Sequence, residues 1–90
     1  MDAILLQRSK QHHADGIVEI VIWRVPEPIK PCTHGYKYRL VYVVNGVRQV
    51  GYDNERGKGD HKHLAGAETT YAFINVTTLL TDFWQDVEGG

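Results

Sequence analysis

The residues best suited to chemistry in this sequence are concentrated in one short stretch, residues 52–63. It reads Tyr-Asp-Asn-Glu-Arg-Gly-Lys-Gly-Asp-His-Lys-His and combines acids, bases, permanent cations and glycines. A turn between strands needs only about two to five residues of Gly, Asn, Asp or Pro type, so folding alone does not require this mixture. The stretch therefore indicates a site that acts on a charged substrate.

Two histidines in the stretch, His61 and His63, are candidates for a proton donor and a proton acceptor. In an extended backbone their side chains share a face, while Lys62 between them points away. An unperturbed imidazole titrates at about pH 6.5, close to working pH. Metal-independent RNA cleavage needs a base for the 2′-hydroxyl, an acid for the departing 5′-oxygen and cations for the phosphate. The pair therefore predicts acid–base chemistry on a phosphodiester without a cofactor.

The remaining residues of the stretch and its neighbours supply the supporting roles. Gly57 and Gly59 flank Lys58, which lets backbone amides approach a phosphate closely. The candidate phosphate binders are Arg56, Lys58, Lys62, Lys37 and Arg39. The carboxylates should be ionised at neutral pH, and they are expected to orient the histidines rather than react. These carboxylates are Asp53, Glu55 and Asp60. Tyr52 is a candidate to orient the substrate or share in proton transfer.

Other interpretations of the stretch stay open. The His-x-His pair with Asp53 or Asp60 could hold a divalent ion, although four firm ligands are not visible. Cys32 and His34 are too remote in the sequence to be counted with them. A solvated loop whose charges pair with one another is the simplest structural interpretation. The rival function is a non-catalytic module that binds RNA or a protein through the same basic loop.

Composition limits the class of protein. Ninety residues with 42% hydrophobic and 23% charged residues predict one folded domain over residues 1–90. A lone cysteine, no signal-peptide pattern and no apolar run of about 20 residues predict a cytoplasmic protein without membrane contact. The net charge is −1, yet residues 34–63 hold six basic residues against three acidic ones. A locally basic surface that attracts phosphate is therefore expected.

The elements that position these residues can be predicted from turn signals and alternation. Residues 3–13 and 17–25 predict a hairpin around Asp15-Gly16, although residues 4–6 could also open a short helix. Residues 36–44 and 47–53 predict a second hairpin around Asn45-Gly46. Three prolines place a loop at residues 26–35. Residues 69–74 predict a further strand.

The second hairpin determines which side chains meet. A two-residue loop at Asn45-Gly46 sets Arg39 opposite Tyr52. Lys37, Arg39 and Tyr52 then share one face beside the polar loop. A slip of one residue would move Tyr52 to the other face.

Near the end of the chain, apolar residues recur with helical spacing. These are Val76, Leu79, Leu80, Phe83, Trp84 and Val87. Asn75 is the expected N-cap, Gly89-Gly90 the expected end, and Thr81, Asp82, Gln85 and Asp86 are expected to face outward. The predicted fold class is α+β, an antiparallel β-sheet of about five strands with a C-terminal helix packed on one face. The other face is left uncovered, which makes a homodimer a possible assembly.

Several segments together resemble one family. They are residues 22–26 (Ile-Trp-Arg-Val-Pro), residues 36–40 (Tyr-Lys-Tyr-Arg-Leu), the polar block 52–63 and the ending Tyr71-x-Phe73 with Leu80-x-Asp82-Phe83. This pattern is similar to the TumE family from about residue 3 to 88. The resemblance implies the toxin half of a prokaryotic toxin–antitoxin pair, with ribonuclease activity and RNA as substrate. It also implies a cognate antitoxin, typically a helix-turn-helix protein.

Overall fold

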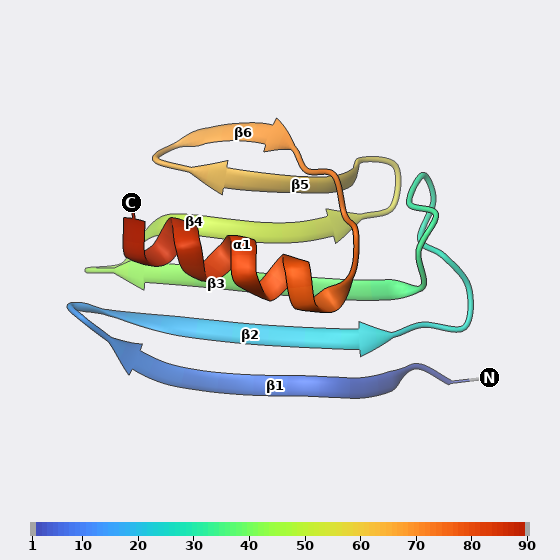
Figure 1. The fold of residues 1–90 in the computed structure, drawn as a ribbon, viewed down its shortest axis with the longest axis horizontal. Helices are drawn as coiled ribbons and strands as arrows, with labels where there is room; N and C mark the ends of the chain where they lie inside the picture. The colour runs from blue at the N-terminus through green and yellow to red at the C-terminus, as the bar shows by residue number, and fades with distance from the viewer. Residues whose placement is uncertain (1, 90) are drawn as a thin grey trace.

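The computed structural model describes residues 2–89, in which six strands form one sheet and one helix packs on one face of it, along β3 and β4 (Figure 1). The elements are β1 (Ile4–His13), β2 (Gly16–Arg24), β3 (Tyr36–Val44), β4 (Val47–Glu55), β5 (Gly59–Leu64), β6 (Ala67–Thr70) and α1 (Val76–Gly89). All neighbouring strands are antiparallel, and their order in the sheet follows the chain. The predicted α+β class and the helix on one face are confirmed, with six strands instead of about five.

The hydrophobic core lies between α1 and the middle strands. Alternate residues of β2, β3 and β4 point toward the helix, because side chains along a strand alternate between the two faces. The buried cluster comprises Val18, Ile20, Ile22, Tyr38, Leu40, Tyr42, Val50, Tyr52, Leu79, Phe83 and Val87. The predicted helical stripe is confirmed at its centre, where Leu79, Phe83 and Val87 are buried.

The helix begins at the predicted cap. Oδ1 of Asn75 accepts a hydrogen bond of 2.7 Å from the backbone amide of Thr78, which satisfies one of the free amides of the first turn. The helix extends to Gly89, and Gly90, expected to help end it, lies outside the described residues. Within residues 2–89, no helix is long and apolar enough to cross a membrane.

The polar stretch is a hairpin, and the prediction of a loop there was wrong. β4 continues to Glu55 and β5 begins at Gly59, so only residues 56–58 form the turn. Gly57 and Gly59 have φ values of 89° and 80°, which glycine adopts without strain. The strand predicted over residues 47–53 was therefore two residues too short, and β5 was missed, because residues 54–63 carry polar side chains on both faces and show no apolar alternation.

A β-bulge changes the predicted pairing of the second hairpin. The Asn45-Gly46 turn is confirmed, with φ values of 51° and 75°, but the register shifts by one residue a short way along the strands. Leu40 therefore pairs with Tyr52, and Arg39 pairs with Asp53. The predicted Arg39–Tyr52 pair was wrong. The bulge inserts one extra residue, and this moves Tyr52 to the helix-covered face.

The first hairpin turns one residue earlier than predicted. His13 pairs with Gly16, so the turn consists of Ala14 and Asp15, with Ala14 at φ 51°. Gly16 lies inside β2, where a Cβ atom would come within 2.4 Å of the Val43 carbonyl oxygen. Close approach of the neighbouring strand, rather than turn geometry, therefore requires glycine at this position.

The predicted strand over residues 69–74 is shorter and begins earlier. β6 spans Ala67–Thr70, and it pairs with β5 across the residues from His61 to Leu64. Residues 71–75 connect β6 to the helix without regular structure. Tyr71 and Phe73 pack against the core from this connection.

Two helix carboxylates face the sheet and not solvent, contrary to the prediction. Asp82 accepts a hydrogen bond of 2.6 Å from the Tyr71 hydroxyl. Asp86 accepts one from the Tyr52 hydroxyl and lies 3.4 Å from Nζ of Lys62. These contacts join the polar edge of α1 to β4, to β5 and to the connection after β6.

Candidate functional site

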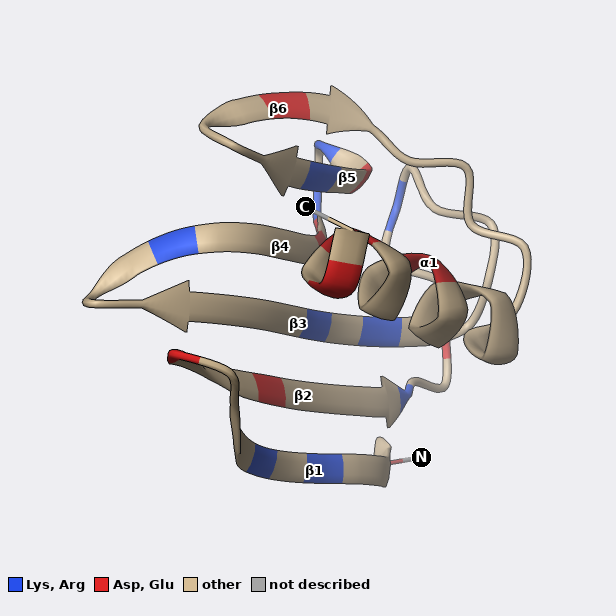
Figure 2. Ribbon diagram, turned by 60° about the vertical axis from the view of Figure 1, so that its left-hand side comes forward, with Lys and Arg blue, Asp and Glu red and all other residues tan. Residues whose placement is uncertain are grey.

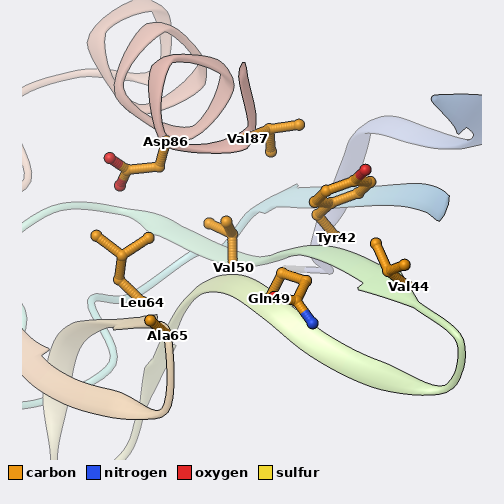
Figure 3. A pocket seen from close by; sticks show the side chains of 8 residues that line it. All are labelled: Tyr42, Val44, Gln49, Val50, Leu64, Ala65, Asp86 and Val87. Carbon is orange, nitrogen blue, oxygen red and sulfur yellow. The ribbon is translucent and has the colours of Figure 1, made fainter. Parts of the chain in front are cut away.

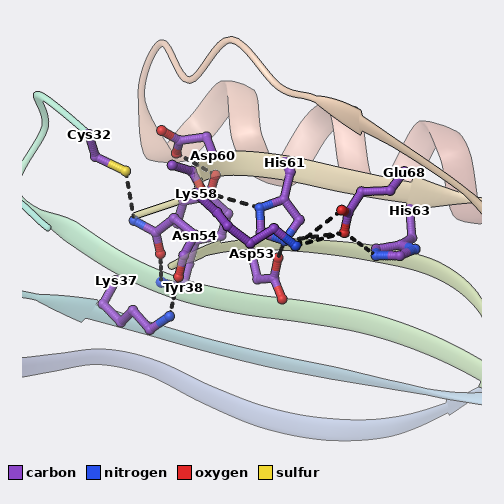
Figure 4. Close-up of polar contacts among 11 residues, drawn as sticks. Cys32, Lys37, Tyr38, Asp53, Asn54, Lys58, Asp60, His61, His63 and Glu68 are labelled. Carbon is purple, nitrogen blue, oxygen red and sulfur yellow. Dashed lines mark hydrogen bonds and ion pairs between the residues drawn. The ribbon is translucent and has the colours of Figure 1, made fainter. Parts of the chain in front are cut away.

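The polar residues of β4, β5 and β6 meet on the face of the sheet opposite α1, which we call the open face. The register pairs Asp53 with His61 and His63 with Glu68, and residues paired across strands share a face. We call Asp53, Lys58, His61, His63 and Glu68 the imidazole–carboxylate cluster (Figure 4). The prediction that both histidines share a face is confirmed, and their ring centroids lie 6.3 Å apart.

His61 is the buried member of the cluster, with 5% of its surface exposed. Its Nδ1 lies 3.1 Å from the carbonyl oxygen of Gly59, and a carbonyl only accepts, so Nδ1 carries a proton. Its Nε2 lies 2.5 Å from Oδ1 of Asp53 and 3.6 Å from Oε2 of Glu68. Both ring nitrogens therefore face protein acceptors, and neither is open to a substrate.

The contact between His61 and Asp53 is an ion-pair distance without the alignment of a hydrogen bond. Oδ1 of Asp53 is buried, and it has no hydrogen-bond partner within residues 2–89. A charged imidazolium or a cation would stabilise this oxygen. Asp53, Glu55 and His61 offer ligand atoms within 4.8 Å of one another, so these three residues could hold a divalent cation.

His63 has a different environment. Its Nε2 lies 2.6 Å from Oε2 of Glu68, and 24% of its side chain is exposed. Like the His61–Asp53 contact, this is an ion-pair distance without the alignment of a hydrogen bond, and within residues 2–89 Nδ1 of His63 has neither a hydrogen-bond nor an ion-pair partner. An imidazole oriented by a carboxylate on one nitrogen and free on the other is suited to general acid–base work.

Lys58 reaches from the β4–β5 turn to the same carboxylate. Its Nζ lies 3.1 Å and 3.3 Å from the two carboxylate oxygens of Glu68. The hydrogen bond to Glu68 raises the pKa of Lys58, and the hydrogen bond from Lys58 lowers the pKa of Glu68. Lys58 is therefore charged and Glu68 ionised at neutral pH. The sequence did not indicate Glu68, because its strand is short and its partner strand was predicted to be a loop.

Arg48 is a second residue that the sequence did not single out. A Cβ atom on Gly51 would lie 2.9 Å from Cδ and 3.5 Å from Nη1 of Arg48. Gly51 pairs directly with His63. The missing side chain at Gly51 therefore lets Arg48 lie across β4, next to the strand position of His63.

The other predicted phosphate binders surround the cluster at larger distance. Arg39 pairs with Asp53 and is exposed on the open face, two strands from His61. Nζ of Lys37 donates a hydrogen bond to the backbone carbonyl of Asn54. Arg56 is exposed in the β4–β5 turn. Of these residues, Arg39 has the clearest access to a ligand on the open face.

Tyr52 and Lys62 lie on the helix-covered face, away from the cluster. Only 1% of Tyr52 is exposed, and its hydroxyl donates to Asp86. Burial and then this hydrogen bond raise the pKa of Tyr52 well above its usual value. Nζ of Lys62 lies 5.6 Å from the centre of the Tyr52 ring. The prediction that Tyr52 shares a face with Lys37 and Arg39 was wrong.

Asp60 lies apart from His61 and His63, in a second polar cluster that contains His34. Its Oδ2 accepts hydrogen bonds of 2.6 Å from the Tyr38 hydroxyl and 2.7 Å from Nε2 of His34. Cys32, His34 and Asp60 offer ligand atoms within 4.8 Å, so the fold brings together residues that had seemed too remote. Nδ1 of His34 accepts the Tyr36 amide at 3.2 Å, so Nε2 carries the proton that Asp60 accepts. A cation at this cluster would have to displace that proton.

A cavity of about 590 Å³ lies on the helix-covered face, beside the end of α1 (Figure 3). Tyr42, Val50, Leu64 and Val87 give it a mainly apolar lining. Its carboxylate, Asp86, is already bonded to Tyr52. The imidazole that has a ring nitrogen without a partner, His63, therefore lies on the open face and not in this cavity.

The fold and the site define a small α+β protein with an acid–base cluster and flanking cations on an uncovered sheet face. The chain matches the family model described as toxin TumE over residues 3–89, and it belongs to this family. A toxin family of this kind implies an antitoxin partner. No curated protein and no solved structure matches the chain.

Proposed function

We propose that this TumE-family toxin is a metal-independent endoribonuclease in which His63 is the general base. The observation that carries the proposal is the environment of His63, which has one nitrogen on Glu68 and the other free on the open face. Three cations lie on the same face, namely Lys58, Arg48 and Arg39. This is the set of groups that cleavage through a 2′-hydroxyl needs.

The proposed reaction uses these groups in order. Nδ1 of His63 takes the proton of a 2′-hydroxyl, and the oxygen attacks the adjacent phosphorus. The P–O bond to the 5′-oxygen breaks, and the ammonium of Lys58 protonates the departing oxygen. The products are a 2′,3′-cyclic phosphate and a 5′-hydroxyl end. Glu68 orients His63, and Arg48 and Arg39 neutralise the charge that develops on the phosphate.

His61 acts as a positioning residue in this scheme and not as the acid. Both of its nitrogens face protein acceptors, and its ring meets the edge of the His63 ring. Its place between Asp53 and Glu68 keeps the Glu68 carboxylate directed at His63. A pH–rate profile separates the roles, because His63→Gln should remove the acidic limb of the profile and His61→Gln should only displace it.

The direct test is cleavage of end-labelled RNA in the presence of EDTA. We expect His63→Gln to lower kcat by about 10²- to 10⁴-fold, the usual contribution of a general base. His12→Gln, which removes an exposed histidine of β1, should leave the rate unchanged. A second variant, Lys58→Met, removes the proposed general acid. Its matched control is Lys30→Met, in the loop before β3. Equal rates for His63→Gln and His12→Gln in folded proteins would contradict the proposal.

The same assay separates two other functions. Cleavage that needs added Mn²⁺ or Mg²⁺ and leaves 5′-phosphate ends would indicate a metal-assisted enzyme, which the Asp53, Glu55 and His61 ligand set favours. RNA binding that weakens with salt and produces no cleavage would indicate a non-catalytic module. Either result would replace the general-base scheme.

The antitoxin implied by the family is proposed to be a helix-turn-helix protein that acts in the cytoplasm. Its expected effect is to block access to the open face. Co-expression of the protein encoded by the neighbouring gene should suppress both toxicity and RNA cleavage. A complex that forms without loss of cleavage would show that the partner binds elsewhere.

A further inference from the structure

The open face of β1, β2 and β3, beyond the imidazole–carboxylate cluster, carries its own set of basic and aromatic residues. Arg8 of β1 pairs with Val21 of β2, Val21 pairs with Arg39 of β3, and Arg39 pairs with Asp53. Since His61 pairs with Asp53 in turn, one row of paired residues runs from Arg8 to the cluster. Figure 2 shows the basic residues of β1 and β3 along these strands.

Trp23 lies beside this row. It pairs with Lys37 on β3, and the Arg8 guanidinium lies 5.9 Å from the centre of its ring. Trp23, Val21, Lys37 and Arg39 line a small hollow of about 170 Å³. Its position on an uncovered face, rather than in the core with Phe83 and Trp84, is not explained by packing of the helix.

We propose that Trp23, with Arg8, Lys37 and Arg39, forms a binding subsite for single-stranded RNA that leads to His63. This inference rests on the proposed ribonuclease function, because it names the part of the substrate that lies outside the reacting bond. The indole ring stacks on an unpaired base, and the cations hold the adjoining phosphates. Within residues 2–89, Glu19 is the one carboxylate that the register places on this face of β1–β3. The charge of the surface therefore complements a polyanion.

Single-stranded RNA fits this surface better than a duplex. The sheet face is broad and presents an aromatic ring to a base, whereas the bases of a duplex are stacked on one another and inaccessible to it. The interstrand spacing of about 4.8 Å places the backbone of Trp23 about 14 Å across the sheet from that of β5. An extended strand of several nucleotides can therefore contact Trp23 while one phosphate lies at the cluster.

The test uses the fluorescence of Trp23 itself. The sequence has two tryptophans, so Trp84→Phe leaves Trp23 as the reporter. In a His63→Gln background, which prevents cleavage, a short oligouridylate should quench this fluorescence, and the quenching should weaken as salt rises. Polarisation of a labelled oligouridylate on the chain with both tryptophans provides the same affinity if the Trp84 variant does not fold.

Substitutions locate the contact. Trp23→Ala should weaken oligouridylate binding on the order of tenfold, and Trp23→Phe should restore most of it. Arg39→Ala should also weaken binding. Arg24→Ala removes the same charge from the same region but not from the open face, and it should have little effect. Cleavage of a dinucleotide, which is too short to reach Trp23, should be unchanged in Trp23→Ala.

The outcomes are distinct for the two proposals. If RNA quenches the fluorescence but the chain with His63 intact does not cleave RNA, the ribonuclease proposal is contradicted and the RNA-binding subsite is retained. Equal binding by the chain and by Trp23→Ala would overturn the subsite, as would equal quenching by duplex RNA. Burial of Trp23 in a dimer of two copies through this face would overturn it as well.

Discussion

The two faces of the sheet both set an aromatic ring against a carboxylate, with different consequences. On the helix-covered face, the tyrosine hydroxyls of β3 and β4 donate to Asp60 and Asp86, and burial keeps these phenols protonated. On the open face, His63 and Glu68 form a similar contact at the edge of solvent. Burial makes the first kind of pair a constraint on the fold, and exposure leaves the second kind free to exchange a proton.

The largest predicted effect is a loss of unfolding free energy at alkaline pH, which depends on the tyrosines of the helix-covered face. Burial, and then hydrogen bonds to aspartates, raise the pKa of Tyr38, Tyr52 and Tyr71 in the folded chain. In the unfolded chain these phenols titrate at about pH 10. Because the folded pKa is the higher one, the stabilisation is complete below about pH 10 and is lost as pH rises above it.

Urea unfolding monitored by circular dichroism from about pH 8 to about pH 12 measures this loss. Tyr71→Phe should make the decline shallower, because one of the three titrating groups is removed. A free energy of unfolding that stays constant across that range would show that the tyrosine–aspartate pairs do not constrain the fold.

The second prediction concerns the core beneath the helix. Phe83 is buried against the ring of Tyr52, with ring centroids 5.8 Å apart. Phe83→Ala should cost about 3–5 kcal/mol of unfolding free energy, since it leaves a cavity under α1. Gln85→Ala on the exposed side of the helix should change it by less than about 0.5 kcal/mol. Similar values for the two variants would mean that α1 does not bury the core as described.

Asn54 provides the third prediction, because its side chain replaces strand pairing where the β3–β4 ladder ends. Its Oδ1 accepts the Tyr38 amide at 3.0 Å, and its Nδ2 donates to the Tyr36 carbonyl at 2.7 Å. Asn54→Ala should lower the unfolding free energy by about 2–3 kcal/mol, since two buried backbone groups lose their partner. Gln49→Ala, in the exposed bulge, is the control. A loss below about 0.5 kcal/mol would show that water takes over both hydrogen bonds.

Tyr52→Phe tests directly on which face the chemistry lies. It removes the hydroxyl that donates to Asp86 and keeps the ring in the core. The expected loss is about 1 kcal/mol of stability, with no change in RNA cleavage by the folded protein. A tenfold fall in kcat without unfolding would return Tyr52 to the active site and contradict the assignment of the faces.

Much of the fold was predictable from local signals. Asn45-Gly46, the three prolines and the apolar period of the last helix each depend on neighbouring residues only, and each was confirmed. The shared face of His61 and His63 follows from strand alternation alone. The two-residue period of strand side chains was therefore enough to predict the central pair of the candidate site.

What the sequence did not reveal depends on contacts between distant residues. The bulge near Gln49 is a register shift that no turn signal encodes, and it alone moved Tyr52 to the covered face. Glu68 reaches His63 only because β6 adds to the sheet edge. His61 is 5% exposed, whereas 24% of the His63 side chain is exposed, and this difference, which decides between their roles, is not encoded by strand alternation.

The smallest predicted effect tests the open face without touching a charged residue. Gly51 has an ordinary strand conformation, so Gly51→Ala should leave stability unchanged or raise it slightly. Its new methyl group would displace Arg48, whose Cδ lies 2.9 Å from that position. RNA cleavage should fall by about threefold to tenfold, less than the loss of a whole charged hydrogen bond.

Arg48→Ala should lower cleavage at least as much, and the Gly51→Ala, Arg48→Ala double variant should be no worse than Arg48→Ala alone. The losses of cleavage rate are not additive when both substitutions act through the same guanidinium group. Val47→Ala, an exposed neighbour in the same strand, is the control. Additive losses in the double variant would mean that Gly51 affects His63 by another route. Undiminished cleavage in Arg48→Ala would remove this cation from the site and leave Arg39 to neutralise the charge on the phosphate.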